Sequence, residues 1–404
     1  MREKQYIVTE RVHLMCPNMH FGIKSRIKAS YEFIKIENTM KLLMNAHPFL
    51  RSLIAIEKTT EKLYYEFYDE IQIPILEKER ADLWSKDYQE LTVNGWDVFN
   101  ESLLKVVVYP LEEDFEVLFI AHHLLGDGRA IIGLVCEFAD SYVIGKKPAY
   151  VNEQLICSIH DFPNGSDLSF ISRFIINSTN RKWVKENHKV SYSEYRDFER
   201  QFMFENATSY LEETVETERV DKLLALCRKN KISLNDYIVA EMMCREQINK
   251  IVIAADIRKY LNCYQEGALG NYATAVRIVS NSKSDNVIER AKDVSKQIKR
   301  HLNDNHKMMM VLSCYLRMSP KLIDAIAIST IGNFQSKSGK FLGTVIFGYE
   351  KRNGYSVTNL GNVNNLNIVE AMFIPPASPA NKKTMGVLSV NGLMKKCTVN
   401  YKME

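Results

Sequence analysis

The most informative stretch of this sequence is Ala121-His122-His123-Leu124-Leu125-Gly126-Asp127-Gly128. It follows the apolar run 115–121, which is typical of a strand, and it precedes residues 129–143, in which apolar side chains recur at helical spacing. Its two glycines allow the backbone to turn sharply between the two elements. Catalytic residues often lie on an open loop beside a rigid strand end, so we expect the chemistry of this protein here.

The two histidines of this stretch are predicted to face in opposite directions. Side chains alternate along a strand, so His123 shares a face with Phe119, whereas His122 shares the other face with Ile120. This alternation also argues against a metal site, because adjacent strand residues do not easily reach one ion. The ordinary pKa of histidine, about 6.5, suits a base that takes a proton near neutral pH. Asp127 is expected to fix the loop, as the N-cap of the next helix or through a cation. The alternative interpretation is that both histidines are structural and simply lie beside an Asp-Gly turn.

Length and composition limit the classes of protein that this chain can represent. With 404 residues, of which 46% are hydrophobic and 25% charged, it is neither disordered, nor a collagen, nor a bundle of membrane spans. Its 53 basic and 49 acidic residues give a net charge of +4, and this near balance does not favour a nucleic acid partner. A chain of this length usually divides into two domains.

The N-terminal segment and the cysteines favour a cytoplasmic protein. The charged start of the chain leads into no long apolar run, so neither a leader peptide nor a membrane span is predicted. The eight cysteines are too widely spaced for a CxxC zinc half-site. We therefore expect free thiols in a reducing compartment, and no metal.

Helical and strand patterns are mixed in both halves of the chain, which predicts an α/β or α+β fold. Residues 146–200 are less periodic, and we interpret them as the connection between two lobes. Strands are predicted at residues 53–56, 63–67, 103–109, 115–121, 251–255, 275–279, 341–347, 385–390 and 397–401. Helices are predicted at residues 39–46, 129–143, 218–228, 234–246 and 287–302.

The motif His122-His123-x-x-x-Asp127-Gly128 is similar to the HHxxxDG motif of the chloramphenicol-acetyltransferase-like superfamily. This superfamily includes nonribosomal-peptide condensation domains, polyketide-associated acyltransferases and alcohol acetyltransferases. Two departures from its pattern are Ala130, where members often have serine, and the pair Val357-Thr358, which separates Ser356 from Asn359 in a late "Ser-Asn-Leu-Gly" element. The further segments that resemble the family are residues 40–52, 103–106, 256–258, 270–272, 356–361 and 386–392.

The resemblance implies mixed sheets in two similar lobes, residues 1–160 with the motif and residues 161–404, around a V-shaped cleft with an active-site tunnel. His123 would be the general base, and Asp127 would point away from the substrate and pair with Arg258. Amide groups of Gly128 and Asn271 would be candidates to stabilise an oxyanion. The residues expected to support the site are His122, Gly128 and Arg258, and those expected to contact substrate or oxyanion are Asn271, Ser356 and Asn359.

The function implied is acyl transfer from a thioester, on coenzyme A or an acyl carrier protein, to a hydroxyl or amine. No tightly bound cofactor and no covalent acyl-enzyme are expected, and we expect a monomer. The alternatives are a stand-alone condensation-type enzyme that forms an amide in nonribosomal peptide or related biosynthesis, and a non-catalytic binding module. The basic and aromatic segment 171–189 would dock a carrier protein or a membrane surface, or else be a solvated connector helix.

Overall fold

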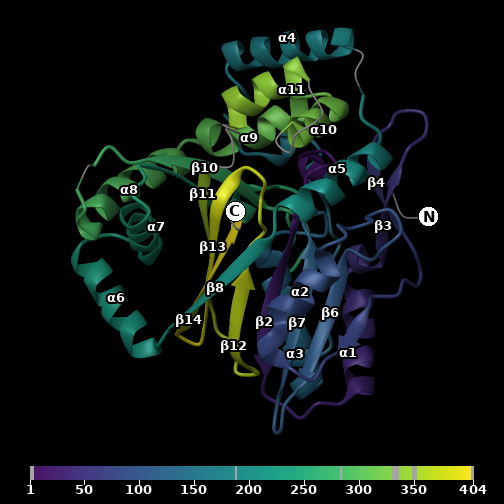
Figure 1. Ribbon diagram of the computed structural model, residues 1–404, viewed down its shortest axis with the longest axis vertical. Coiled ribbons are helices and arrows are strands. Elements are labelled where there is room, and N and C mark those ends of the chain that lie inside the picture. The colour runs from purple at the N-terminus through teal and green to yellow at the C-terminus, as the bar shows by residue number, and fades with distance from the viewer. Residues whose placement is uncertain (1–3, 187–188, 283, 330–335, 348–352, 402–404) are drawn as a thin grey trace.

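The computed structural model describes residues 4–186, 189–282, 284–329, 336–347 and 353–401. These residues form two large mixed sheets, each covered by helices, and one small sheet (Figure 1). The predicted mixed α/β class and the division into two lobes are confirmed.

The first lobe is built on a five-stranded sheet with the strand order β12-β2-β7-β6-β5, in which β12 spans Ile368–Ile374. Helices α1 (Phe33–Ala46) and α3 (Gly128–Ile144) pack together, and Phe138 of α3 covers Phe119 of β7, with ring centroids 5.5 Å apart. Every residue of β7 is buried, because β7 lies between two neighbouring strands with packed side chains on both faces. The strands from this half of the chain are β2 (His20–Ile27), β5 (Ile75–Glu77), β6 (Leu104–Pro110) and β7 (Phe115–His122).

The small sheet has the order β1-β4-β3. Helix α2 (Trp84–Thr92) instead lies against β2, with the Tyr88 ring 5.5 Å from that of His20. Strands β3 (Ser52–Ile56) and β4 (Leu63–Phe67) form the predicted hairpin, and β1 (Gln5–Tyr6) adds to its edge. Short 3-10 turns are η1 (Thr9–His13), η2 (Pro48–Arg51), η3 (Ala81–Leu83), η4 (Ile159–Asp161) and η5 (Arg258–Tyr260).

The second lobe is built on a six-stranded sheet with the order β10-β9-β11-β13-β14-β8. A separate cluster of buried valine, isoleucine and methionine side chains joins this sheet to its helices. The hairpin β13–β14 closes through Asn391 and Gly392, both at positive φ, as the tight turns that match strand twist require. The strands are β8 (Thr208–Val215), β9 (Lys250–Asp256), β10 (Ala273–Val279), β11 (Gly354–Val363), β13 (Asn381–Val390) and β14 (Leu393–Tyr401), and the helices are α6 (Thr217–Lys229), α7 (Leu234–Arg245) and α8 (Val287–Leu302).

A group of helices lies above both sheets in Figure 1, with α4 outermost and α11 beneath it. Buried side chains of α9 and α10 belong to the same hydrophobic cluster as the first-lobe core. A buried ion pair joins this group to η1: Arg11 Nη2 lies 2.8 Å from Asp324 Oδ2, and both side chains are only 3% exposed. The helices of this group are α4 (Phe170–Glu186), α9 (Asn305–Arg317), α10 (Pro320–Ile328) and α11 (Lys337–Leu342). Helix α5 (Tyr192–Glu205) lies elsewhere, with the ring of Phe202 5.8 Å from that of Tyr401 on β14.

One strand crosses from the second half of the chain to the first lobe. β12 (Ile368–Ile374) pairs antiparallel with β2 at the edge of the first-lobe sheet. The two sheets are therefore linked by the backbone as well as by side chains. The boundary between residues 160 and 161 stays a prediction.

The predicted strand at 341–347 is wrong. Residues up to Leu342 belong to α11, and Gly343–Phe347 forms a π-helical turn. Helix α11 begins where the Ser336 side chain accepts a hydrogen bond from the Gly339 N–H. Gly339 lies so close to α10 that a Cβ atom there would come within 2.9 Å of the Ala325 carbonyl oxygen. Packing against α10 thus outweighs the strand propensity of this apolar run.

Candidate active site

His122 and His123 lie where β7 ends, and their main chain is held from both sides. The His122 N–H donates to the Leu103 carbonyl oxygen (2.9 Å), and the His123 N–H donates to that of Met19 (2.8 Å). The His122 side chain is buried beside Trp96, with ring centroids 5.8 Å apart. Its Nδ1 accepts a hydrogen bond from the Leu124 N–H (3.2 Å), and burial holds its pKa well below the usual range. The support role of His122 stays a prediction.

The His123 ring lies between two aromatic rings. His13 stacks on it with centroids 4.6 Å apart and planes 16° apart, and Phe21 lies 4.8 Å away at a tilt of 55°. Burial lowers the pKa of His123 below the usual value of 6.5, although the hydrogen bond with Asn271 acts in the opposite direction. The imidazole is therefore neutral at pH 7, the form in which it can accept a proton.

Asn271 determines which nitrogen of His123 is free. Its Nδ2 donates to the His123 carbonyl oxygen (2.6 Å), and its Oδ1 lies 3.1 Å from His123 Nδ1. Because an amide oxygen only accepts, the ring proton belongs on Nδ1. With the proton on Nδ1, His123 Nε2 keeps its lone pair.

Asp127 fixes the loop, by both of the means that the sequence suggested. Its Oδ1 accepts the N–H groups of Arg129 (2.9 Å) and Ala130 (3.0 Å), which makes it the N-cap of α3. The same oxygen accepts a hydrogen bond from Arg258 Nη2 at 2.7 Å, so the expected pair between the lobes is formed. Its Oδ2 accepts the Tyr272 N–H (2.8 Å), next to Asn271 in the chain.

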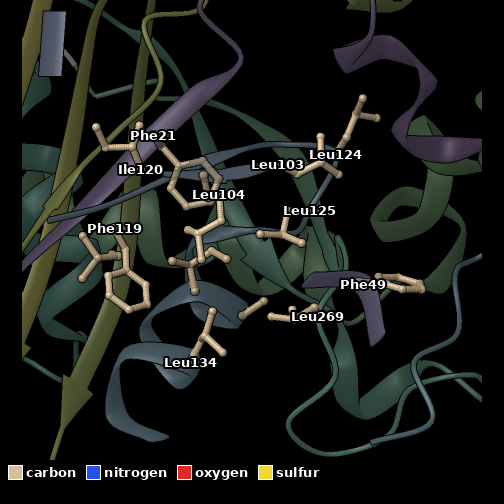
Figure 2. Packing of buried hydrophobic residues seen from close by; sticks show 14 of the residues in the cluster. Phe21, Phe49, Leu103, Leu104, Phe119, Ile120, Leu124, Leu125, Leu134 and Leu269 are labelled. Atoms are coloured by element: carbon tan, nitrogen blue, oxygen red, sulfur yellow. The ribbon is translucent and has the colours of Figure 1, made fainter. Parts of the chain in front are cut away.

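Two loops meet closely at this place. The Asp127 N–H donates to the Gly270 carbonyl oxygen (3.1 Å), and a Cβ at Gly126 would come within 3.0 Å of the Gly270 nitrogen. A Cβ at Gly128 would lie 2.9 Å from the end of the Leu360 side chain, so this glycine packs closely against β11. Leu269, from the second half of the chain, belongs to the buried cluster shown in Figure 2.

A buried histidine and a buried glutamate anchor the loop that carries Asn271. Glu153 Oε1 accepts the Leu269 N–H (3.1 Å) and lies 3.0 Å from His47 Nδ1. His47 Nε2 lies 2.7 Å from Glu137 Oε2. Although burial acts to lower it, hydrogen bonds to the two carboxylates raise the pKa of His47 to about 9. Sequence reasoning noted His47 only as part of a family segment, and it missed Glu153 and His13.

Ser356 and Asn359 lie on β11 and are engaged with neighbouring strands and helices. Ser356 Oγ donates to Thr384 Oγ1 (3.1 Å) and accepts from Asn381 Nδ2 (2.8 Å). Asn359 Nδ2 donates to Asn235 Oδ1 (3.3 Å). None of these contacts involves His123, and the substrate contacts expected of both residues stay a prediction.

Two cavities lie near the second-lobe sheet. One, of about 1110 Å³, lies between β9, β10, α8 and α9, and its lining includes Lys250 and Arg277. The other, of about 490 Å³, lies beside Arg258 and is also lined by Tyr264 and Glu266. His123 lines neither cavity, so the tunnel expected at the base stays a prediction.

The segment 171–189 lies largely in α4, at the top of Figure 1. Ile176 and Trp183 are buried, as expected of a connector helix with buried anchors. Phe170 and Phe174 are exposed, at 80% and 61%, on the same helix as the exposed Lys182. Docking of a carrier protein or a membrane surface stays a prediction.

Comparison with known proteins places this arrangement in a fold family. No family model and no curated protein matches the sequence. The structure is similar to a trichothecene 15-O-acetyltransferase from Fusarium sporotrichioides, with a TM-score of 0.61 and 11% identity over 99% of this chain and 91% of the other. It is similar to polyketide synthase associated protein 5 from Mycobacterium tuberculosis (TM-score 0.58, 14% identity, 100% and 93% of the two chains). It is also similar to the first condensation domain of the calcium-dependent antibiotic synthetase (TM-score 0.59, 9% identity, 99% and 91%).

At sequence identities of 9–14%, these structural similarities define the fold of the chain. The chain has the two-lobed fold of condensation domains and chloramphenicol-acetyltransferase-like acyltransferases, as the motif around His123 predicted. All eight cysteines are unbridged. Within the described ranges, no helix is both long enough and apolar enough to span a bilayer, and no three potential metal ligands gather.

Proposed function

We propose that this protein is an acyltransferase that moves an acyl group from a thioester to a hydroxyl or amine. The observation that carries the proposal is the state of His123. Its ring is neutral, and its Nδ1 is held by Asn271, which leaves the lone pair of the ring on Nε2. This arrangement suits a general base, whose contribution to rate is typically about 10²–10⁴-fold.

The reaction follows from this geometry. His123 Nε2 takes the proton of the acceptor hydroxyl or amine as the oxygen or nitrogen attacks the thioester carbonyl carbon. The tetrahedral intermediate then collapses, the carbon–sulfur bond breaks, and the thiolate takes the proton back from the imidazolium. No bond to the protein forms, so both substrates are bound together and proximity supplies much of the acceleration.

Asp127 and Arg258 are positioning residues in this proposal. They hold the loop from Gly126 to Gly128 against the loop that carries Asn271, through contacts of 2.7–3.1 Å. The base from the first lobe and the amide that orients it from the second lobe are thereby kept in register. Catalysis therefore depends on the contact between the lobes.

The acyl donor is a thioester of coenzyme A or of an acyl carrier protein, each a phosphopantetheine thioester. The fold is shared by an O-acetyltransferase and by condensation domains, which supports acyl transfer without deciding between a hydroxyl and an amine acceptor. Among the alternatives, we favour the stand-alone transferase over the amide-forming condensation enzyme and over a non-catalytic binding module.

The test is a screen of acyl-CoA and acyl-carrier-protein donors against hydroxyl and amine acceptors, with products identified by mass spectrometry. We expect His123→Ala to lower the rate by about 10²–10⁴-fold. His160→Ala is the matched control, because it removes an imidazole that is exposed. Full transfer activity in the His123→Ala protein would show that the proposal is wrong.

A further inference from the structure

His13 is held firmly beside His123 by contacts outside the HHxxxDG motif. It ends η1, and its ring stacks on that of His123 with centroids 4.6 Å apart. Arg11, two residues earlier in η1, makes two hydrogen bonds to Asp324 of α10, at 3.0 and 2.8 Å, and a third to the Glu61 carbonyl oxygen at 3.2 Å. Because these partners come from α10 and from the connection between β3 and β4, the position of η1 does not depend on the stack alone.

The surroundings of the His13 ring determine where its proton lies. The Nδ1 atom of His13 is buried and has no hydrogen-bond partner, whereas Nε2 is not buried in this way. The residue as a whole is half-buried. Burial and the neighbouring His123 hold the pKa of His13 well below the usual range, so the ring is neutral. A buried N–H without an acceptor is among the rarest arrangements in proteins. The single ring proton therefore belongs on Nε2, where it can reach a partner.

The two stacked rings thus offer a hydrogen-bond acceptor on one ring and a donor on the other. His123 offers a lone pair on Nε2, because Asn271 Oδ1 accepts from its Nδ1. His13 offers an N–H donor on Nε2. In acyl transfer the attacking atom and the developing oxyanion are attached to the same carbon. Hydrogen bonds of roughly 2.7–3.1 Å to both then need a base and a donor that are close neighbours, and a stacked pair provides this.

The oxyanion donors predicted from the sequence, Asn271 and Gly128, leave room for a further side-chain donor such as His13. Asn271 uses its Nδ2 on the His123 carbonyl oxygen, at 2.6 Å. Gly128 has no side chain and offers only a main-chain N–H. A side-chain donor that lies directly against the base is therefore an addition to the predicted set.

We propose that His13 is a catalytic residue that donates a hydrogen bond from Nε2 to the thioester carbonyl oxygen as it becomes an oxyanion. The inference rests on the proposed acyl transfer. When the acceptor attacks, its proton moves to His123 Nε2 and the carbonyl π electrons move to oxygen, where the His13 N–H stabilises the charge. When the carbonyl re-forms, the carbon–sulfur bond breaks and the thiolate takes the proton from His123. His13 keeps its own proton throughout.

The kinetic test compares two substitutions of His13. His13→Phe keeps a flat ring against His123 and removes the donor, and we expect kcat to fall about 10²–10³-fold, the usual effect of losing one oxyanion donor. His13→Gln keeps an N–H donor without the ring, and we expect it to recover part of this loss. Circular dichroism spectra and unfolding midpoints are measured for both variants to check that they fold. Wild-type kcat in folded His13→Phe, or equal losses in the two variants, overturns the proposal.

A second measurement does not depend on turnover. Nitrogen-15 NMR of the imidazoles in the resting wild-type protein should show a proton on Nε2 of His13 and on Nδ1 of His123. A proton on Nδ1 of His13 would overturn the proposal even if every variant folded poorly. If the wild-type protein transfers no acyl group from any thioester, the proposed function has failed. If wild-type transfer depends on His123 but not on His13, only the present inference has failed.

Discussion

Replacing Arg258 by glutamine removes the cation from the buried carboxylate of Asp127. The Arg258 and Asp127 side chains are 11% and 8% exposed, and their closest atoms lie 2.7 Å apart. Arg258 also contacts Asp256 Oδ1 at 3.2 Å, but that carboxylate is 38% exposed and the contact contributes little. Asp127 keeps its hydrogen bonds from the main-chain N–H groups of Arg129, Ala130 and Tyr272.

The magnitude follows from these contacts. Breaking a buried ion pair by removing one partner typically costs about 3–5 kcal/mol. Because three N–H groups remain on the Asp127 carboxylate, we expect the lower end, about 3 kcal/mol, for Arg258→Gln. Asp127→Asn should cost about as much, since it leaves Arg258 with only Asp256. The double variant should cost less than the sum, with a coupling energy of about 2 kcal/mol.

The assay is urea unfolding at pH 7 of the wild type, both single variants and the double variant, with acyl transfer measured in parallel. Activity should fall with stability, because Tyr272, which Asp127 holds, is next to Asn271. Arg80→Gln is the matched control, since Arg80 pairs with Asp82 on the surface, where both side chains are more than half exposed, and its unfolding midpoint should not change. If the single variants behave like this control and the coupling energy is zero, the reasoning is refuted.

Two further predictions concern the pH dependence of stability and of activity. Glu10 is 1% exposed, neither carboxyl oxygen has a hydrogen-bond partner, and burial raises its pKa from 4.5 to about 7. Its contribution to stability is therefore full below pH 4.5 and is lost as the pH rises to about 7, and at 1.36 kcal/mol per pKa unit this is about 3 kcal/mol. Glu10→Gln should be more stable than the wild type at pH 8 and similar to it at pH 4, and identical unfolding curves at both pH values would contradict this. For activity, the acid limb of kcat/KM should lie below pH 6.5, because burial lowers the pKa of His123. Asn271→Ala should move that limb to lower pH, because it removes a bond that favours the charged ring. It should also lower kcat by roughly 10²-fold, less than the 10⁴ lost when the carboxylate of a serine-protease triad is replaced. An unchanged pH profile would argue against the assigned tautomer.

The local features of the site were predictable because their causes lie within a few residues. The N-cap bonds of Asp127 reach only to Arg129 and Ala130, and side-chain alternation along β7 separates His122 from His123. The strand–turn–helix unit therefore follows from sequence alone. Its resemblance to a known motif extended the prediction to Arg258, whose contact with Asp127 spans 131 positions.

The predictions were weakest where a distant partner decides the outcome. Residues 341–347 have strand propensity, yet close packing of Gly339 against α10 places them at the end of a helix. The crossing of β12 to pair with β2 likewise depends on the edge that the first lobe leaves open.

The turn that carries His123, its capping by Asp127 and the mixed class of the fold depend on local propensity and periodicity, so they could be predicted from the order of residues alone. The stacking of the His13 ring on His123 and the contact of the Asn271 oxygen with its Nδ1 came from the folded structure. The structure also showed that Glu153, which contacts His47, holds the loop that carries Asn271 through the Leu269 N–H. Burial and hydrogen-bond partners set the protonation and tautomer of a histidine, and here both come from segments far apart in the chain.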